Sequence, residues 1–321
     1  QGKKVLILVL KNKGEAFDRA QKEGLEIMQH AYSDSFYRNL LVSSKPRCVL
    51  SHCSFSGAKI ADSNNIPFVQ VVHNLYIWTR TYPEIKKEII NSIPFTTAAI
   101  GVSKRVSEFF TEEYGMPRTR SLTILNGVDL GKFNFSRGKR ISRRNSLQLS
   151  DSDFVLLVSA SISYQKNYIS LIRAFSLATR SCSNLRLLIV GKVYDKSLFR
   201  KIEELIIKEN IKDKVSYLGN VENIQEYYFA ADALIQASFY EGCSLSVLEA
   251  LASSLPVISS EIAVTEEMKK FGKVISVESP VPLESLVMGS LEKRYPHFEH
   301  NLSRAIVQFA SEPQAKREPT S

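Results

Sequence analysis

Short apolar runs alternate with amphipathic stretches along most of the chain. In the first half, these runs predict buried strands at Val5–Leu10, Leu25–Met28, Cys48–Ser51, Ile66–Val72, Ala98–Val102 and Leu122–Leu125. Helices are expected between them, at Ser35–Val42, Ser56–Ser63, 83–92 and 104–114. Continuous apolar strands that alternate with helices are typical of a parallel sheet with helices on both faces.

The same alternation restarts after a basic stretch near residue 140. Strands are predicted at Phe154–Ser159, Leu185–Val190, Val215–Leu218, Leu234–Ile235, from Val257 and at Lys273–Val277. Helices are predicted at 167–180, 195–209, Ile224–Ala230 and from Ser244. We therefore expect an α/β chain with two Rossmann-like, doubly wound domains, at 1–135 and 151–300. Residues 136–150 would form a basic linker, and 301–321 a C-terminal helix with a frayed tail.

Polar residues and glycines follow many of the predicted strands directly. They are His73, Ser103, Asn126, Ser161, Gly191, Gly219 and Glu241. In open parallel sheets, ligands bind at the carboxyl ends of the strands. These positions are therefore candidates for a binding site. Taken singly, each has a simpler reading: His73 as a structural histidine, and Ser103 and Asn126 as caps of a helix or a turn.

The segment Leu234–Ile258 carries the most specific pattern. It predicts a strand, a small loop with Gly242 and a helix that opens near Ser244. A helix N-terminus offers free backbone N–H groups and a positive dipole end, which suits a phosphate. Two acids of this segment, Glu241 and Glu249, would flank that anion site, although an isolated pair could equally be surface acids.

Composition narrows the class of protein. The 321 residues are 44% hydrophobic and 23% charged, which is typical of a globular protein. No run approaches the ~18 apolar residues of a membrane span, and the N-terminal residues do not resemble a signal peptide. The four cysteines have no metal-ligand spacing, so we expect reduced thiols and a cytoplasmic location.

Charge is concentrated in one half. Residues 1–150 hold 23 Lys+Arg and 12 Asp+Glu, a net of +11, whereas the remainder has a net of −2. A basic half indicates an anionic partner, with an anionic membrane surface favoured over nucleic acid because no recognition motif accompanies the charges. Part of the excess is the run RGKRISRR at 137–144, which could be a solvated linker.

Several stretches, in order, resemble the retaining glycosyltransferases of family 4, which have the GT-B fold. They are VVHN (71–74), IGVS (100–103), TILNGVDLGKF (123–133), SYQKNYISLIRAF (163–175), LLIVGK (187–192) and the long stretch 215–261 that contains EGCSLSVLEALA. The Glu-x7-Glu spacing in the last stretch is the most specific feature. The resemblance covers roughly residues 45–275, and it implies transfer of a sugar from a nucleotide-sugar donor.

The resemblance also implies roles for individual residues. Glu241 would contact the donor sugar, His73 would face the transferred sugar, and Lys166 would neutralise the leaving diphosphate. The backbone N–H groups of Cys243 to Leu245 would hold the diphosphate or sugar, and Glu249 would accept both ribose hydroxyls. The donor site would also include Gly242, Ser161, Gly191 and Gly219, and the acceptor side Ser103 and Asn126. No metal or other cofactor would be needed.

Three departures from the family pattern limit this expectation. An arginine usually stands where this chain has Ser161, and Arg173 and Lys192 are candidates to replace it. The usual glycine pair after the strand at Val257 aligns with Ala263 and Val264. The N-terminal half is short, so VLILVL would be either the first strand of the domain or the second with the first missing.

The leading expectation is a retaining, metal-independent glycosyltransferase that uses a UDP- or GDP-linked sugar. Its acceptor would be a polysaccharide or lipid-linked glycan, as in lipopolysaccharide assembly, and its basic half would lie on the inner face of the cell membrane. One alternative is a non-catalytic partner or stabilising subunit of a glycosyltransferase complex, and a second is a nucleotide-sugar epimerase on the same fold.

Overall fold

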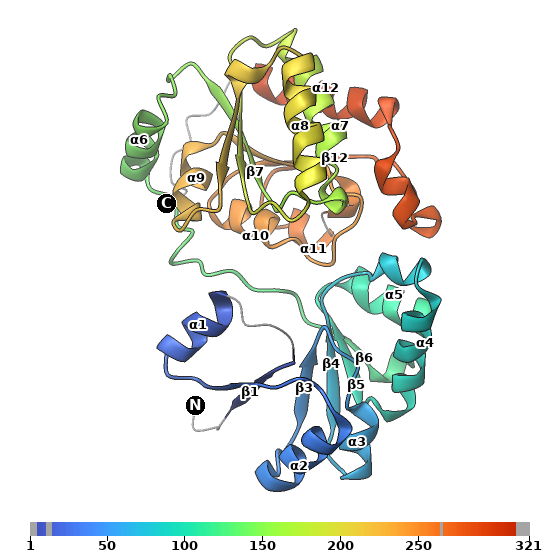
Figure 1. The fold of residues 1–321 in the computed structure, drawn as a ribbon. Coiled ribbons are helices and arrows are strands. Elements are labelled where there is room, and N and C mark those ends of the chain that lie inside the picture. Colours follow the sequence, from blue (N-terminus) through green and yellow to red (C-terminus); the bar gives the residue numbers. More distant parts are fainter. Residues whose placement is uncertain (1–4, 11–14, 264–265, 313–321) are drawn as a thin grey trace.

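The computed structural model describes residues 5–10, 15–263 and 266–312. They form two α/β domains, one above the other in Figure 1. Both domains contain only parallel strand pairs in the described residues. The predicted alternation of strands and helices is therefore confirmed, and most expected bounds agree with the structure within two residues.

The N-terminal domain contains two sheets in the described residues. A two-stranded sheet pairs β1 (Leu6–Val9) with β2 (Glu26–Gln29), and a four-stranded sheet has the order β3-β4-β5-β6. The latter strands are Val49–His52, Phe68–Val72, Ala98–Gly101 and Ser121–Thr123. The helices are α1 (Glu15–Lys22), α2 (Asp34–Ser44), α3 (Ala58–Ser63), α4 (Pro83–Ser92) and α5 (Lys104–Tyr114).

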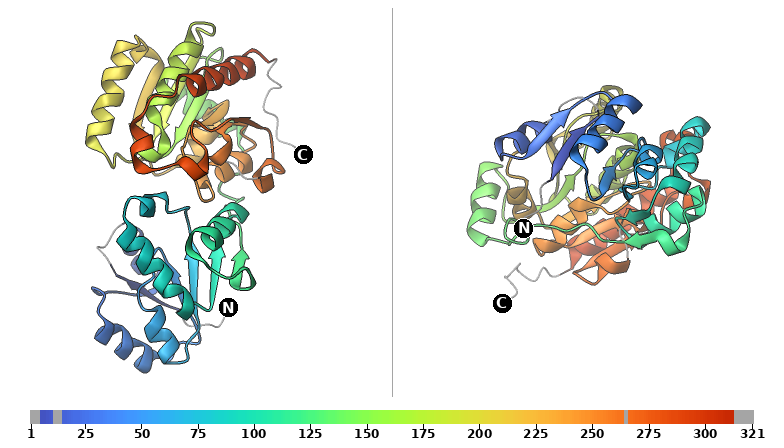
Figure 2. Two further views of the ribbon diagram at one scale, coloured as in Figure 1. Left: turned by 90° about the vertical axis from the view of Figure 1, so that its right-hand side faces the viewer. Right: turned by 90° about the horizontal axis from the view of Figure 1, so that it is seen from below.

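The C-terminal domain has one six-stranded sheet in the order β12-β11-β10-β7-β8-β9. Its strands are β7 (Phe154–Ser159), β8 (Leu185–Val190), β9 (Val215–Gly219), β10 (Ala233–Gln236), β11 (Val257–Ser260) and β12 (Val274–Val277). Its helices are α6 (Arg137–Ser146), α7 (Tyr168–Thr179), α8 (Lys196–Lys208), α9 (Ile224–Ala230), α10 (Leu245–Ala252), α11 (Glu266–Lys269) and α12 (Pro296–Ser311). The long α12 packs on α7, beside the sheet (Figure 2).

The two domains are packed against each other. A single cluster of buried apolar side chains includes Val72 and Leu75 from the N-terminal domain and Phe239, Tyr240 and Cys243 from the C-terminal domain. The carboxyl ends of β4 and β10 therefore meet across the interface, with α5 on one side and α10 and α11 on the other (Figure 1).

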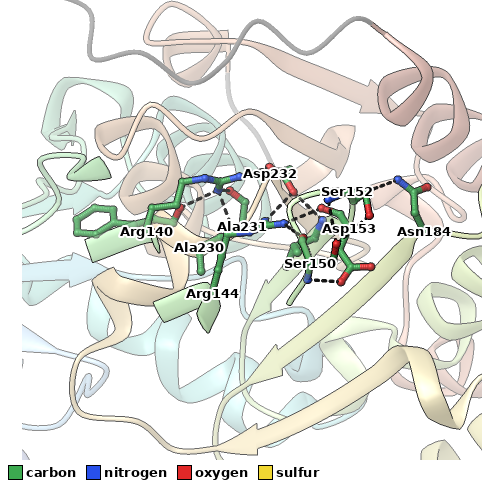
Figure 3. A network of polar contacts seen from close by, with 11 residues as sticks. Arg140, Arg144, Ser150, Ser152, Asp153, Asn184, Ala230, Ala231 and Asp232 are labelled. Atoms are coloured by element: carbon green, nitrogen blue, oxygen red, sulfur yellow. Dashed lines mark hydrogen bonds and ion pairs between the residues drawn. The ribbon is translucent and has the colours of Figure 1, made fainter. Parts of the chain in front are cut away.

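The expected solvated linker at 136–150 is wrong. Residues 137–146 form helix α6, which packs on α9. Arg140 donates to the carbonyl oxygens at the end of α9 and pairs with Asp232 at 2.7 Å (Figure 3). Arg144 pairs with the other oxygen of Asp232 at 3.3 Å and is 5% exposed. The basic run thus fastens α6 to the C-terminal domain, because its arginines satisfy a buried acid and the free carbonyls of a helix end.

Candidate functional site

Glu241 lies at the centre of a buried polar cluster just beyond β10. Its side-chain oxygen Oε1 accepts from Lys166 Nζ at 2.5 Å, and from Gln236 Nε2 and Ser238 Oγ at 2.8 Å each. Lys166 ends a single 3-10 turn, Tyr164–Lys166, between β7 and α7. The neighbouring strands β7 and β10 thus carry the cation and the acid to the same edge of the sheet. The sequence pattern predicted this edge for Glu241, and Lys166 was expected from the family resemblance alone.

Gln165 fixes the backbone on which Glu241 stands. Its carbonyl oxygen accepts from Phe239 N at 2.9 Å, and its side-chain Nε2 donates to the carbonyl oxygen of Tyr240 at 2.8 Å. The same Nε2 is 3.5 Å from Glu241 Oε2. Because three closer donors occupy Oε1, Oε2 is the oxygen with the greater capacity to accept from a ligand hydroxyl.

The loop after Glu241 leads directly into α10. Ser244 precedes the helix, but its hydroxyl donates to Gln236 Oε1 at 2.9 Å and does not cap the helix. Within the part of the chain that the structure describes, the backbone N–H groups of Cys243, Ser244 and Leu245 have no hydrogen-bond acceptor. Three free donors at a helix start form a site suited to an anion, as the sequence predicts.

Gly242 lies against the N-terminal domain. A Cβ atom added there would stand 2.0 Å from the carbonyl oxygen of His73 and 3.1 Å from Asn74 Cα. Both neighbours are backbone atoms that cannot rotate away. Glycine is therefore required at this position for the two domains to approach as they do.

Ser103 and Asn126, expected on the acceptor side, contact the backbone of this same loop. Ser103 Oγ donates to the carbonyl oxygen of Gly242 at 2.7 Å, and Asn126 Nδ2 donates to that of Cys243 at 3.3 Å. Ser103 is fully buried, so it is not open to an acceptor in this conformation. Its predicted role as the cap of α5 is confirmed, because its hydroxyl accepts from Val106 N at 3.2 Å.

The backbone and the side chain of His73 contact different parts of the molecule. Its carbonyl oxygen faces Gly242, whereas its imidazole Nε2 lies 2.8 Å from Nδ1 of His52, at the end of β3. Burial, and to a smaller extent His52, lower the pKa of His73. His52 was not among the predicted site residues, although the adjacent parallel strands β3 and β4 bring their carboxyl ends together.

Glu249 lies on α10, one side of which faces α9. Tyr228 of α9 donates its hydroxyl to Glu249 Oε2 at 2.7 Å. Burial raises the pKa of Glu249, against the opposing effects of the Tyr228 hydrogen bond and the charge of Lys132. Oε1 has no hydrogen-bond partner among the described residues, so this oxygen is free to accept from a ligand.

The remaining predicted positions lie at the carboxyl ends of β7, β8 and β9. Ser161 is partly exposed beyond β7. Gly191 is needed for packing, because a Cβ there would stand 2.1 Å from the carbonyl oxygen of Ala160. Gly219 has φ +69 and open space around it. Arg173 lies on α7, and its buried Nε has no hydrogen-bond partner in the described residues. Nor does any hydrogen bond or ion pair join Arg173 or Lys192 to the Glu241 cluster in this part of the chain.

Other predictions fall at the limits of what is described. Val264 of the altered glycine pair, the loop at 11–14 and the tail at 313–321 lie outside the described residues. Whether VLILVL is the first or the second strand of its domain stays an open prediction, since β1 is described only through its pairing with β2. In the residues described, no helix is long and apolar enough to cross a membrane.

Comparison with known proteins agrees with this geometry. Residues 139–281 match the family described as "Glycosyl transferases group 1". An uncharacterized glycosyltransferase of Methanocaldococcus jannaschii is 27% identical over 226 residues, which cover 67% of this chain and 57% of that protein. An alpha-monoglucosyldiacylglycerol synthase of Acholeplasma laidlawii is 26% identical over 64% of this chain and 56% of its own length. The chain thus spans a little over half the length of these relatives.

Solved structures show the same fold over nearly the whole chain. The Anabaena protein HepE, in complex with UDP and glucose, superposes with a TM-score of 0.71 at 15% identity, over 95% of this chain and 86% of that one. WaaG, a glycosyltransferase involved in lipopolysaccharide biosynthesis, gives a TM-score of 0.68 at 15% identity, over 98% and 88% of the two chains. The chain has the GT-B fold, and its residues 139–281 are similar to the glycosyl transferases group 1 family.

Proposed function

We propose that this protein is a retaining glycosyltransferase that moves a sugar from a nucleotide-sugar donor to a polysaccharide or lipid-linked glycan acceptor. One observation carries the proposal: the Glu241–Lys166 pair and the free N–H groups of residues 243–245 lie together at the start of α10. An acid that can hold a sugar and donors that can hold a diphosphate are the two requirements of a nucleotide-sugar site.

Lys166 is the cation of the proposed donor site. In the structure it pairs with Glu241, and both side chains are largely buried. A bound diphosphate would supply a second anion for Lys166, and the amides of Cys243, Ser244 and Leu245 would share its charge. These groups act where charge develops as the bond between the sugar and the diphosphate breaks, which is where preorganised donors accelerate a reaction most.

Glu241 and Glu249 have separate roles in this proposal. Oε2 of Glu241 would accept from a hydroxyl of the donor sugar, while Oε1 stays engaged with the protein. Oε1 of Glu249 would accept from the ribose, with Tyr228 holding the other oxygen of that carboxylate. Glu241 precedes α10 and Glu249 lies about one turn into it, so a ligand that spans the helix start would have one acid near each of its ends.

The donor would be UDP- or GDP-linked, and no metal or other cofactor would take part. Support for a uridine nucleotide comes from HepE, whose structures contain UDP or UDP-glucose. In the described residues, no three His, Cys, Asp or Glu side chains gather as metal ligands would. Lys166 and the backbone amides would supply the positive charge that a metal supplies in other transferases.

The acceptor and location are proposed from charge and similarity. Without helix α6, which packs on the C-terminal domain, residues 1–135 hold 18 Lys+Arg and 12 Asp+Glu, a net charge of +6. One relative is an alpha-monoglucosyldiacylglycerol synthase, and one structural neighbour is involved in lipopolysaccharide biosynthesis. The basic half would therefore lie on the anionic inner face of the cell membrane and present a lipid-linked or glycan acceptor. Equal binding to anionic and neutral vesicles at low salt would contradict this part of the proposal.

The test is an assay of donor hydrolysis and transfer over a panel of UDP- and GDP-sugars, with binding of UDP and GDP measured in parallel. Turnover of one donor with retained anomeric configuration is the expected result. Binding without transfer or hydrolysis would favour a non-catalytic partner subunit. Interconversion of two nucleotide-sugars would identify an epimerase, and no binding of either nucleotide would exclude both enzyme functions.

A further inference from the structure

Two residues of the N-terminal domain hold the backbone of the proposed donor loop. Ser103 and Asn126 lie 139 and 117 positions before their hydrogen-bond acceptors, the carbonyl oxygens of Gly242 and Cys243. Both contacts cross the domain interface, and both end on consecutive peptide groups. Their consequence depends on the donor site proposed above.

The hydroxyl of Ser103 both accepts and donates a hydrogen bond. It accepts from Val106 N at 3.2 Å as the cap of α5, and it donates its single proton to Gly242 O at 2.7 Å. The side chain is completely buried, so solvent does not compete for either contact. Because the cap uses the oxygen and not the proton, the capping position leaves Ser103 able to donate across the interface.

Asn126 acts on the next peptide group from a different segment. It lies three residues beyond β6, and its amide Nδ2 donates to Cys243 O at 3.3 Å. Gly242 permits this arrangement, because any side chain there would collide with the carbonyl oxygen of His73. The tip of the loop is therefore held on one side by two donors and on another by the end of β4.

Because the peptide group is planar, the direction of each carbonyl group in the loop also fixes the direction of the following N–H group. No cis peptide bond occurs in the described residues. In a trans peptide the C=O and the following N–H point in opposite directions. When the carbonyl groups of Gly242 and Cys243 point at Ser103 and Asn126, the N–H groups of Cys243 and Ser244 point away from them. Those N–H groups are two of the free donors at the start of α10.

We infer that Ser103 and Asn126 are positioning residues of the donor site, which orient the peptide groups of Gly242–Cys243 and Cys243–Ser244 so that two N–H groups face the donor diphosphate. Donor binding is then coupled to the approach of the two domains, because the residues that aim the anion site belong to the domain that does not contain it. A loop that lost either contact could rotate its peptide group, and its N–H would no longer be preorganised.

The experiment compares ligands with and without phosphates. The dissociation constants of UDP and uridine are measured by calorimetry, with GDP and guanosine in parallel, for the full-length wild-type chain and for Ser103→Ala and Asn126→Ala. We expect the nucleoside diphosphate to bind about tenfold more weakly to each variant, which corresponds to the loss of one well-placed hydrogen bond to a charged group. The affinity for the nucleoside should not change, because the base and ribose do not contact these amides.

Two further variants separate positioning from folding. Ser103→Thr keeps a hydroxyl that can cap α5 and donate to Gly242, and it should restore the diphosphate affinity. Ser107→Ala removes the hydroxyl of a serine within α5. Among the described residues, this hydroxyl bonds to Leu122 O at 2.9 Å, to Thr123 Oγ1 at 2.8 Å and to the carbonyl oxygen of Ser103, all in the N-terminal domain. This control should bind the diphosphate like the wild type. If loss of the cap prevents Ser103→Ala from folding, the diphosphate affinity of Asn126→Ala alone tests the positioning role.

Unchanged diphosphate affinity in the folded variants would overturn the inference, and so would an equal loss of nucleoside and diphosphate affinity. Either result leaves the proposed function intact as long as the wild type binds a nucleoside diphosphate. A wild-type chain that binds neither UDP nor GDP would instead overturn the proposed function, and the positioning role with it.

Discussion

The two domains bury their sheets to different degrees. Strands β10 and β11 of the C-terminal sheet are buried at every position, and β7 at all but its last residue. The edge strands of both sheets are largely half-buried or exposed. In the N-terminal domain, however, even the central strands β4 and β5 alternate between buried and half-buried positions. Because buried strands with few exposed backbone groups are the most resistant to local opening, the C-terminal sheet is the more rigid support.

The chemistry of the proposed site follows the same division. Glu241, Lys166 and Glu249 stand on the C-terminal domain, at the ends of its buried strands and on α10. The N-terminal domain contributes hydrogen-bond donors and close backbone contacts to the loop between them. The more rigid C-terminal domain thus carries the charged side chains of the proposed site. The N-terminal domain orients the uncharged peptide groups of the loop.

The largest effect is expected from a substitution that destabilises the rigid C-terminal domain. Asp232→Ala leaves Arg140 and the buried Arg144 without their acid and should lower the free energy of unfolding by about 3–5 kcal/mol. Glu226→Ala removes a pair that Arg143 of the same helix makes in a more exposed setting, and should cost less than about 1 kcal/mol. Urea denaturation measures both changes, and hydrogen exchange should place the loss in the C-terminal sheet. Equal losses would mean that burial does not set the value of these pairs.

The next effect concerns the two acids of the C-terminal domain. Glu241→Gln should lower kcat by about 10²–10³-fold, as removal of a preorganised electrostatic group does, with little change in the affinity for the nucleoside diphosphate. Glu249→Gln should instead weaken nucleotide binding about tenfold and leave kcat at saturating donor nearly unchanged. Steady-state kinetics and calorimetry separate the two quantities. Similar effects of both substitutions on both quantities would contradict the assigned roles.

Local patterns in the sequence were sufficient to predict the fold, whereas the roles of the site residues stay predictions that rest on the family resemblance. The strands at Phe154–Ser159 and Leu185–Val190 and the helix at Ile224–Ala230 agree with the structure at both ends, because apolar periodicity and flanking turn residues define them locally. Lys166 entered only through the family resemblance, and the pairing of β7 with β10 explains how it comes to lie beside Glu241. Each of the strand and helix predictions needs only residues that are close in sequence.

Contacts between distant segments could not be predicted in this way. Arg140 and Arg144 belong to a basic run that is indistinguishable in sequence from a solvated segment. Only their ion pairs with Asp232 in the structure show that they pack against the domain. Ser103 was predicted correctly as a helix cap, but nothing near it in sequence indicates that its proton reaches Gly242. Whether a residue contacts the donor loop or an acceptor depends on how the domains dock, which a one-dimensional pattern does not specify.

The approach of the domains can be tested at Gly242. In Gly242→Ala the new methyl group would stand 2.0 Å from His73 O, so the loop or the N-terminal domain must move by roughly 1 Å. A displacement of that size is expected to lower kcat/KM about 100-fold. Gly127→Ala is the matched control, because a Cβ at Gly127, next to Asn126, meets nothing within 4 Å. Wild-type activity in Gly242→Ala would show that turnover does not need this approach, and that the N-terminal domain does not set the geometry of the loop.

The smallest expected effect is a pH dependence that originates in Glu249 of the C-terminal domain. Burial raises the pKa of Glu249, so this carboxylate takes up a proton at a higher pH than an exposed glutamate does. The ionised form is the better acceptor for the ribose hydroxyls, so uridine should bind more weakly as the pH is lowered from about pH 7. Uridine is the appropriate ligand because it has no phosphate that titrates in the same range. In Glu249→Gln this dependence should disappear, whereas in Asn126→Ala, whose defect lies in the other domain, it should persist. Loss of the pH dependence in both variants would mean that the nucleoside site also needs the N-terminal domain.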